Sequence, residues 1–233
     1  MPSAAQLAGF AGNSHEGRIL VPMAKSKKHL VRILFIGNSF TARNDLPGLI
    51  AGLARDRRID VETTLLSIGG ASLRTHWNKG EAAAAIAEAK YDFVVLQEQS
   101  TLPIKNASRM RENVLLFDPI IRKSGATTVL YMTWARKHSP EKQREITTAY
   151  ESIGKEIKAL VAPVGTVWDK FMSKHKSPVL HDKDQSHPTL AGSYLAAFVF
   201  LKTLFGQSPV GIPSVLAGLG AAEVKSLQMA AGK

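Results

Sequence analysis

Three polar residues have the types and spacing of a nucleophile and its activating base. Ser39 follows an apolar run, residues 33–36, and Asp184 stands three residues before His187. A serine hydroxyl attacks well only when a base within hydrogen-bond reach takes its proton, and histidine is the usual base. A carboxylate then holds the imidazole in the required tautomer. Asp182 is a competing carboxylate, but at five residues from the histidine it is less well spaced.

Candidate donors for a negatively charged oxygen follow the neighbouring apolar runs. An oxyanion that develops during nucleophilic attack needs preorganised hydrogen-bond donors. The backbone N–H groups of Ser39 and Gly70 can supply two, and the side-chain amide of Gln97 or Gln99 can supply a third. The sequence leaves open which of these two glutamines would do so.

Each of these residues also has an ordinary structural explanation. Ser39 can cap a helix, and His187 can stand at a helix start. The glycine pair Gly69-Gly70 can form a tight turn, and the segment Gln97–Gln99 can close a strand. The pair His76-Trp77 is expected to pack at the surface. The joint occurrence of a serine and a downstream Asp-x-x-His, in the expected chain order, favours the catalytic interpretation.

Five short segments rich in Val, Ile, Leu and Thr predict strands that are buried on both faces. They are residues 29–37, 61–69, 91–97, 127–134 and 160–168. Helices are predicted at 45–57, 80–89, 107–123, 140–159, 190–205 and 220–231. This alternation predicts an α/β fold, a three-layer α/β/α sandwich with a five-stranded parallel sheet. Ligands bind beyond the carboxyl ends of such strands, where the polar residues described above are expected to meet.

At these residues the sequence resembles the SGNH (GDSL-type) hydrolase superfamily, especially a bacterial branch with four motif blocks. The blocks are GNSFT at 37–41, SIGG at 67–70, LQEQS at 96–100, and a DxxHP block that runs from 184 to 197. The resemblance spans roughly residues 30 to 206 and implies a flavodoxin-like hydrolase fold.

The resemblance also implies roles for individual residues. Ser39 would be the nucleophile, His187 the base, Asp184 its orienting partner and Gly70 an oxyanion-hole donor. The third block departs from the superfamily, which usually supplies an Asn side chain to this hole from a Gly-x-Asn-Asp motif. Gln97 or Gln99 can substitute, because either amide is a donor with longer reach.

The implied activity is hydrolysis of a carboxylic ester through an acyl-enzyme, with no metal or organic cofactor. The expected substrate is a small-molecule or carbohydrate ester with a short acyl group such as acetyl. One alternative is an inactive SGNH-fold module that binds a carbohydrate or another ligand without turnover. Another is a basic protein that binds an anionic polymer in a salt-sensitive way, indifferent to Ser39.

Composition excludes several other classes. The chain has no cysteine, which rules out disulfides and thiolate metal sites. Its net charge of +11 favours anionic partners in general, but no nucleic-acid-binding motif occurs, so nucleic acid is not an expected partner. Phosphate-loop and dinucleotide motifs are absent. The apolar segment 190–205 is too short for a membrane span and is interrupted by Lys202, so a buried helix is expected.

Residues 29–233 are expected to form one domain, preceded by a flexible extension at 1–28 whose start is Met1 or Met23. In this extension the weak apolar patch precedes the positive charge, the reverse of a secretory signal. A cytoplasmic location is therefore slightly favoured. The sequence does not indicate an oligomeric state.

Overall fold

The computed structural model of the protein describes residues 29–213 and 218–232 and has a five-stranded sheet at its centre. The strands are β1 (Val31–Gly37), β2 (Val61–Ser67), β3 (Phe93–Leu96), β4 (Thr127–Tyr131) and β5 (Leu160–Ala162). Their order is β2-β1-β3-β4-β5, and all four pairs are parallel. The predicted α/β sandwich with a five-stranded parallel sheet is confirmed. The predicted extension at 1–28 lies outside the described residues.

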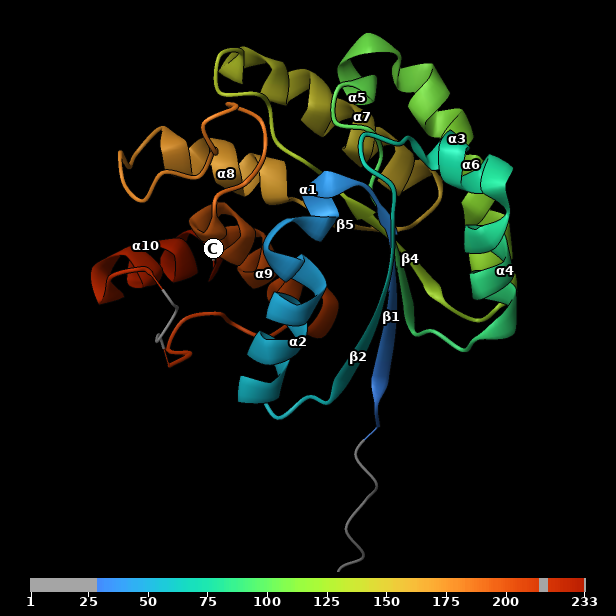
Figure 1. Ribbon diagram of the computed structural model, residues 1–233, viewed down its shortest axis with the longest axis horizontal. Coiled ribbons are helices and arrows are strands. Elements are labelled where there is room, and N and C mark those ends of the chain that lie inside the picture. The colour runs from blue at the N-terminus through green and yellow to red at the C-terminus, as the bar shows by residue number, and fades with distance from the viewer. Residues whose placement is uncertain (1–28, 214–217, 233) are drawn as a thin grey trace, which may run out of the picture.

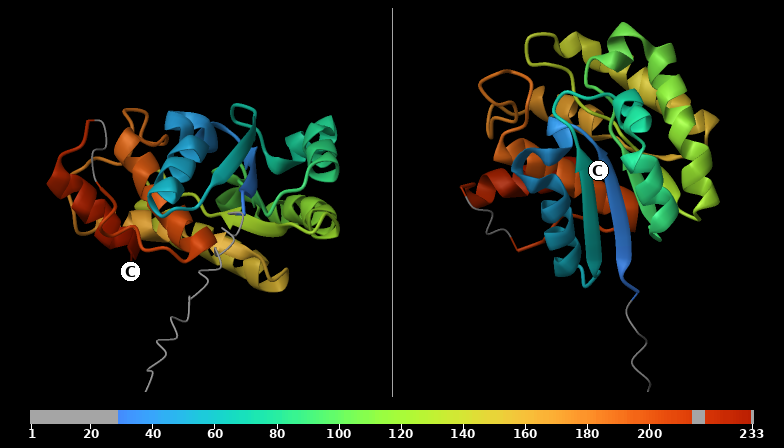
Figure 2. Two further views of the ribbon diagram at one scale, coloured as in Figure 1. Left: turned by 90° about the horizontal axis from the view of Figure 1, so that it is seen from below. Right: turned by 45° about the vertical axis from the view of Figure 1, so that its right-hand side comes forward.

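Helices cover both faces of this sheet (Figure 1). On one face lie α1 (Ser39–Ala42), α2 (Leu46–Asp56), α8 (Val164–Met172), α9 (Leu190–Phe205) and α10 (Ala221–Gly232). On the other lie α3 (Leu73–Lys79), α4 (Glu81–Glu88), α6 (Ala107–Lys123) and α7 (Gln143–Glu156). Short α5 (Leu102–Lys105) packs against α6 and α7, and two 3-10 turns, η1 (Arg43–Asp45) and η2 (Pro140–Lys142), precede α2 and α7. The turned views show the same two helical layers (Figure 2).

The period of two in β1 divides its side chains between two cores. Ile33 and Phe35 point to the α2–α9 side, whereas Leu34 and Ile36 point to the α3–α6 side, and all four are fully buried. Burying each such side chain stabilises the fold by roughly 1.5–3 kcal/mol. The central strands therefore read as continuous apolar runs. The edge strand β2 is only partly buried, because it has a neighbour on one side only.

The predicted fifth strand, 160–168, is wrong after its first three residues. Strand β5 ends at Ala162, and α8 begins at Val164. Pro163 has no N–H to continue the ladder, and its fixed φ suits a helix start. Val164, Trp168 and Phe171 then recur at helical spacing and bury one face of α8 against α9.

The helices at 45–57, 80–89, 107–123, 140–159, 190–205 and 220–231 are confirmed, but the sequence missed α3 and the four-residue helices α1 and α5. Ser72 caps α3 by accepting a hydrogen bond from the Thr75 N–H, and Leu73 is fully buried. Helix α9 is a buried helix, as expected, and in the described part of the chain no helix is long and apolar enough to cross a membrane.

Candidate active site

Ser39 lies where β1 leaves the sheet, at the start of α1 and beside the switch point between β1 and β3. Figure 1 shows α1 at the end of β1. The capping residue of α1 is Asn38, whose Oδ1 accepts from the Phe40 N–H at 3.1 Å. The Ser39 hydroxyl is therefore not needed as a cap. It lies 2.7 Å from His187 Nε2 instead. The Ser39 N–H, in the first turn of a helix, has no intrahelical acceptor.

His187 is in turn bonded to Asp184, its Nδ1 lying 2.5 Å from Asp184 Oδ2. Asp184 Oδ1 accepts from the backbone N–H groups of Ser186 and His187, at 3.0 and 2.9 Å. These bonds, above all that from the His187 ring, hold the pKa of Asp184 well below its usual range. A carboxylate that stays ionised fixes the proton of His187 on Nδ1 and leaves Nε2 free to accept from the serine.

We call residues 182–187 the acid–base turn. Its backbone is closed by the Asp182 N–H, which donates to His187 O at 2.8 Å. Within the turn, Gln185 adopts the left-handed conformation, with a φ of 62°. From the loop after β4, Trp134 donates its indole N–H to Ser186 O at 2.9 Å. The Asp182 carboxylate pairs with Arg43 at 2.9 Å, so Asp184 alone of the two carboxylates orients the histidine.

A small cavity of about 240 Å³ opens at this point. Gly70 belongs to its lining and has a φ of +67°, which an L side chain rarely adopts. The lining also includes an arginine that the sequence analysis did not single out. The lining residues are Asn38, Ser39, Phe40, Gly70, Gln99, Ser100, Arg136, Asp184, Ser186 and His187.

The two candidate glutamines have different surroundings. Gln97 is fully buried, and its Oε1 accepts from the Asn38 N–H and from Thr41 Oγ1, both at 2.9 Å. Its amide nitrogen donates to Glu98 O, and Gln97 is not among the residues that line the cavity. Gln99 lines the cavity, and its Oε1 accepts from the N–H and hydroxyl of Thr101. The Nε2 donor of Gln99 is thus left for a bound group.

The position of the Gln97 side chain also explains why the last residue of β1 is a glycine, Gly37. A Cβ at this position would lie 2.7 Å from both Gln97 Oε1 and Thr41 Oγ1. Contacts this short are essentially never seen, so only glycine lets the Gln97 amide reach the loop that carries Ser39.

Glu98 is a fully buried carboxylate behind the cavity. Its Oε1 accepts from the Leu73 N–H at 3.1 Å and from the Gln99 N–H at 2.6 Å, and its Oε2 accepts from Asn113 Nδ2 at 2.8 Å. Asn113 Oδ1 accepts from Arg74 Nε, which fixes the orientation of that amide. Burial raises the pKa of Glu98, and these bonds oppose the rise. Glu98 thereby links the loop after β2, which contains Gly70, to the loop after β3, which contains Gln99.

His76 is buried, and its expected surface position is wrong. Its Nε2 lies 2.7 Å from Gly37 O, which can only accept, so Nε2 carries the proton. Burial lowers the pKa of His76 and favours the neutral ring. Trp77 is partly buried against Phe117. Because α3 itself was not predicted, the burial of His76 could not be read from the sequence.

We call Asn38, His76, Gln97, Glu98 and Asn113 the buried polar frame.

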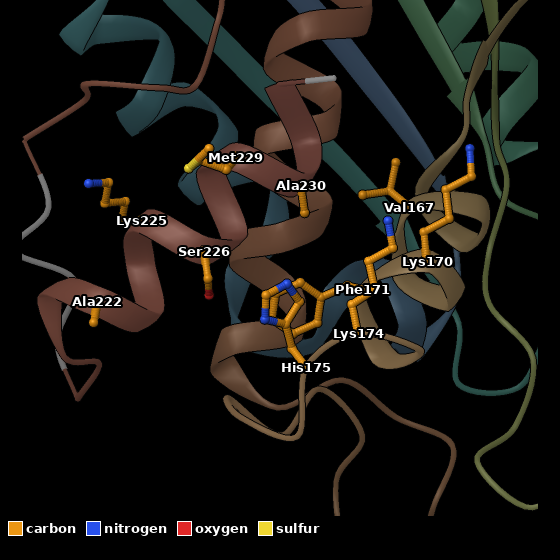
Figure 3. A pocket seen from close by; sticks show the side chains of 10 residues that line it. All are labelled: Val167, Lys170, Phe171, Lys174, His175, Ala222, Lys225, Ser226, Met229 and Ala230. Carbon is orange, nitrogen blue, oxygen red and sulfur yellow. The ribbon is translucent and has the colours of Figure 1, made fainter.

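A larger cavity, about 670 Å³, lies between α8 and α10 (Figure 3). Phe171 and Met229 contribute to its lining, as do Lys170 and Lys174. It includes none of the candidate catalytic residues, so we assign the chemistry to the smaller cavity. Within the described ranges, no group of three or more His, Asp or Glu residues could hold a metal ion.

No known protein-family profile matches the chain, and no curated protein matches it. Solved structures do match. One is a protein of Slackia heliotrinireducens provisionally assigned to the SGNH hydrolases, with 28% identity over 76% of this chain and 100% of that one (TM-score 0.65). A DUF4886 family protein of Bacteroides uniformis has 20% identity over 88% and 94% (TM-score 0.73). Axe2, an acetylxylan esterase of Geobacillus stearothermophilus, has 16% identity over 75% and 94% (TM-score 0.60).

The comparison defines the class of the fold. The parallel sheet in the order 2-1-3-4-5, with helices on both faces, is the SGNH-hydrolase fold. The structural match to SGNH hydrolases agrees with the resemblance in the sequence, and the fold is shared with esterases.

Proposed function

We propose that the protein is a serine esterase that hydrolyses a carboxylic ester through an acyl-enzyme formed on Ser39. One observation carries the proposal. The Ser39 hydroxyl, the His187 ring and the Asp184 carboxylate form a continuous hydrogen-bonded chain, with distances of 2.7 and 2.5 Å. A serine, a histidine and a carboxylate joined in this order constitute the arrangement that activates a serine nucleophile.

The first half of the reaction forms the acyl-enzyme. Ser39 Oγ attacks the carbonyl carbon of the ester while His187 Nε2 takes its proton. Asp184 stabilises the imidazolium that results. When the tetrahedral intermediate collapses, the bond to the alcohol oxygen breaks and His187 returns the proton to the leaving alcohol.

The second half regenerates the enzyme. A water molecule takes the position of the alcohol and gives a proton to His187 as its oxygen attacks the acyl carbon. Collapse of the second intermediate releases the acid and returns the proton to Ser39 Oγ. This scheme predicts ping-pong kinetics, and a burst of alcohol wherever deacylation is the slower step.

Three donors are available to the oxyanion in both halves. They are the N–H groups of Ser39 and Gly70 and the side-chain amide of Gln99, all from residues that line the cavity. Preorganised donors of this kind contribute about 3 kcal/mol each to transition-state stabilisation. Gln99 takes the role for which the superfamily's third block usually supplies an asparagine.

We further propose that the acyl group is short, as acetyl is. The cavity of about 240 Å³ has little room for a longer chain. The resemblance in fold to an acetylxylan esterase motivates tests on acetylated sugars, although at 16% identity it carries no assignment of substrate.

The decisive experiment is hydrolysis of p-nitrophenyl acetate by the parent protein, Ser39→Ala and His187→Ala. We expect turnover in the parent and a loss of at least about a thousandfold in both variants, with unchanged circular dichroism spectra. A pre-steady-state burst that is absent from Ser39→Ala would identify the acyl-enzyme.

Equal background hydrolysis in all three proteins would refute the esterase assignment for this substrate. Acetylated xylo-oligosaccharides are then the second substrate to test. Binding of such a sugar without deacetylation by the parent protein would favour the ligand-binding alternative.

A further inference from the structure

Arg136 is a half-buried residue in the lining of the catalytic cavity. Its chain neighbours are anchored on both sides. The Ala135 O accepts from His181 Nε2 at 3.0 Å, and the Ala135 N–H donates to Gln143 Oε1 at 2.8 Å. On the other side, the Lys137 N–H donates to Gln185 O at 2.9 Å. The backbone of Arg136 is therefore fixed against the acid–base turn.

Among residues 29–213 and 218–232, no carboxylate or carbonyl group pairs with the Arg136 guanidinium. Asp184 is the only acidic residue in the cavity lining, and both of its oxygens are already engaged. Arg43, by contrast, is neutralised by Asp182 just outside the cavity. A partly desolvated cation with no counter-charge is unfavourable unless a ligand supplies the charge.

We propose that Arg136 binds an anionic group of the substrate, so that the substrates of this site are esters that carry a carboxylate. This inference rests on the proposed esterase function and adds the class of ester. A guanidinium presents two parallel N–H donors to a carboxylate, which gives orientation as well as attraction. In the same cavity, Ser39 would meet the ester group while Arg136 holds the anionic end.

The charge of the whole molecule supports the same class of substrate. The chain has a net charge of +11 at pH 7, and Lys137 and Lys183 stand beside the cavity residues in sequence. Such a field attracts anions over long range but does not orient them. The cavity supplies one arginine for orientation, and this is what distinguishes the proposal from general attraction by a basic surface.

The test uses pairs of acetate esters with the same shape and different charge. The pairs are para-acetoxybenzoate with para-acetoxybenzamide, and the corresponding meta compounds. For each pair, kcat/KM for the carboxylate is divided by kcat/KM for the amide. Differences in leaving-group reactivity cancel when this ratio is compared between parent and variant proteins.

We expect the parent to favour the carboxylate of at least one pair and Arg136→Gln to lower that ratio about tenfold or more. Arg136→Lys keeps the charge but loses the fork, and should lower the ratio by less. Lys137→Gln is the matched control. It removes the same charge one residue away, from a side chain outside the cavity lining, and should leave the ratio within about twofold of the parent.

Equal ratios in the parent and Arg136→Gln would overturn the proposal even if both proteins are active esterases. An equal decrease in Lys137→Gln would also overturn it, because the effect would then come from the general field. If the parent hydrolyses no member of either pair, calorimetry of the products decides, and p-nitrophenyl acetate tests the esterase function separately. Binding of para-hydroxybenzoate, but not para-hydroxybenzamide, that is lost in Arg136→Gln would still support the anion site. Absence of such binding would refute it.

Discussion

The acid–base turn and the buried polar frame meet at Ser39 but are built in opposite ways. The turn is local in sequence and partly exposed, with 45% of the Asp184 side chain accessible. The frame joins residues from four separate segments, and each of its members is at least 95% buried. In the proposed mechanism the turn supplies the groups that move protons, whereas the frame fixes the loops from which the oxyanion donors would project. Substitutions in the turn should therefore change reactivity much more than stability, and substitutions in the frame should change stability strongly as well.

The largest effect is expected for Asp184→Asn, which tests the turn. An Asn side chain can still accept from the two backbone N–H groups, but it no longer fixes the Nδ1 proton of His187. We expect kcat for p-nitrophenyl acetate to fall about a thousandfold or more, with only a small decrease in the urea midpoint. Asp182→Asn is the matched control and should retain activity within a few-fold. Comparable losses in the two variants would show that the turn has no single orienting carboxylate.

Glu98→Ala tests the frame. It leaves the N–H groups of Leu73 and Gln99 and the amide of Asn113 without an acceptor. The free energy of unfolding should fall by about 3 kcal/mol, and activity should fall with it. Glu98→Gln keeps one acceptor oxygen and should lose less of both. A Glu98→Ala variant that loses activity but keeps the parent's free energy of unfolding would contradict the structural role that we assign to the frame.

Gln99→Glu tests the point at which the frame reaches the cavity. The carboxylate can still accept from Thr101 but cannot donate to an oxyanion. With a neutral ester, kcat should fall about a hundredfold while KM and thermal stability change little. Activity within about threefold of the parent would exclude Gln99 as an oxyanion donor.

The smallest effect is expected for His76→Gln, measured as stability against pH. Burial lowers the pKa of His76 from its ordinary 6.5, so below that pH the unfolded chain binds a proton that the folded chain resists. The stabilising contribution is thus present above pH 6.5 and is lost as the pH falls toward the lowered pKa. His76→Gln keeps a donor for Gly37 O without titrating. Between about pH 7.5 and pH 5.5, the free energy of unfolding should decrease less in the variant than in the parent. The difference between the two decreases should be under about 1 kcal/mol.

Unfolding free energies in urea at the two pH values give this comparison. Part of the loss should remain in the variant, because burial also lowers the pKa of His181. Identical pH slopes in parent and variant would contradict a buried neutral His76.

The sequence predicted the central strands well because each is a continuous apolar run. It predicted the long helices well because their apolar residues recur at three- and four-residue steps. It failed at β5 and α3, where the elements are short. Three residues of strand and seven of helix contain too little pattern to separate from their surroundings, and tertiary packing decides their state. At Pro163 a local signal for the end of β5 was present.

The same division holds for the candidate site. The acid–base turn could be predicted because Asp184 and His187 are three residues apart, so that one turn of chain is enough to join them. The surroundings of Gln97 and Glu98 follow because side chains continue to alternate between the two faces of the sheet past the end of β3. Val95 faces the α2–α9 side and Leu96 the α3–α6 side, and Gln97 then bonds to the α1 loop while Glu98 bonds to α3 and α6. From the sequence, the residue at which this alternation ends was unknown.

By itself, then, the sequence determined the order of the apolar runs along the chain, the candidate nucleophile and the candidate acid–base pair, because each of these is a pattern of a few consecutive residues. Only the tertiary structure decided that Gln99 rather than Gln97 lines the cavity and that Glu98 links two loops. It also decided that Arg136 lines the same cavity as His187 with no partner among the described residues. Each of these facts depends on residues from different strands meeting at one edge of the sheet. The direction in which a side chain leaves that edge is set by the packing around it and not by the residues next to it in sequence.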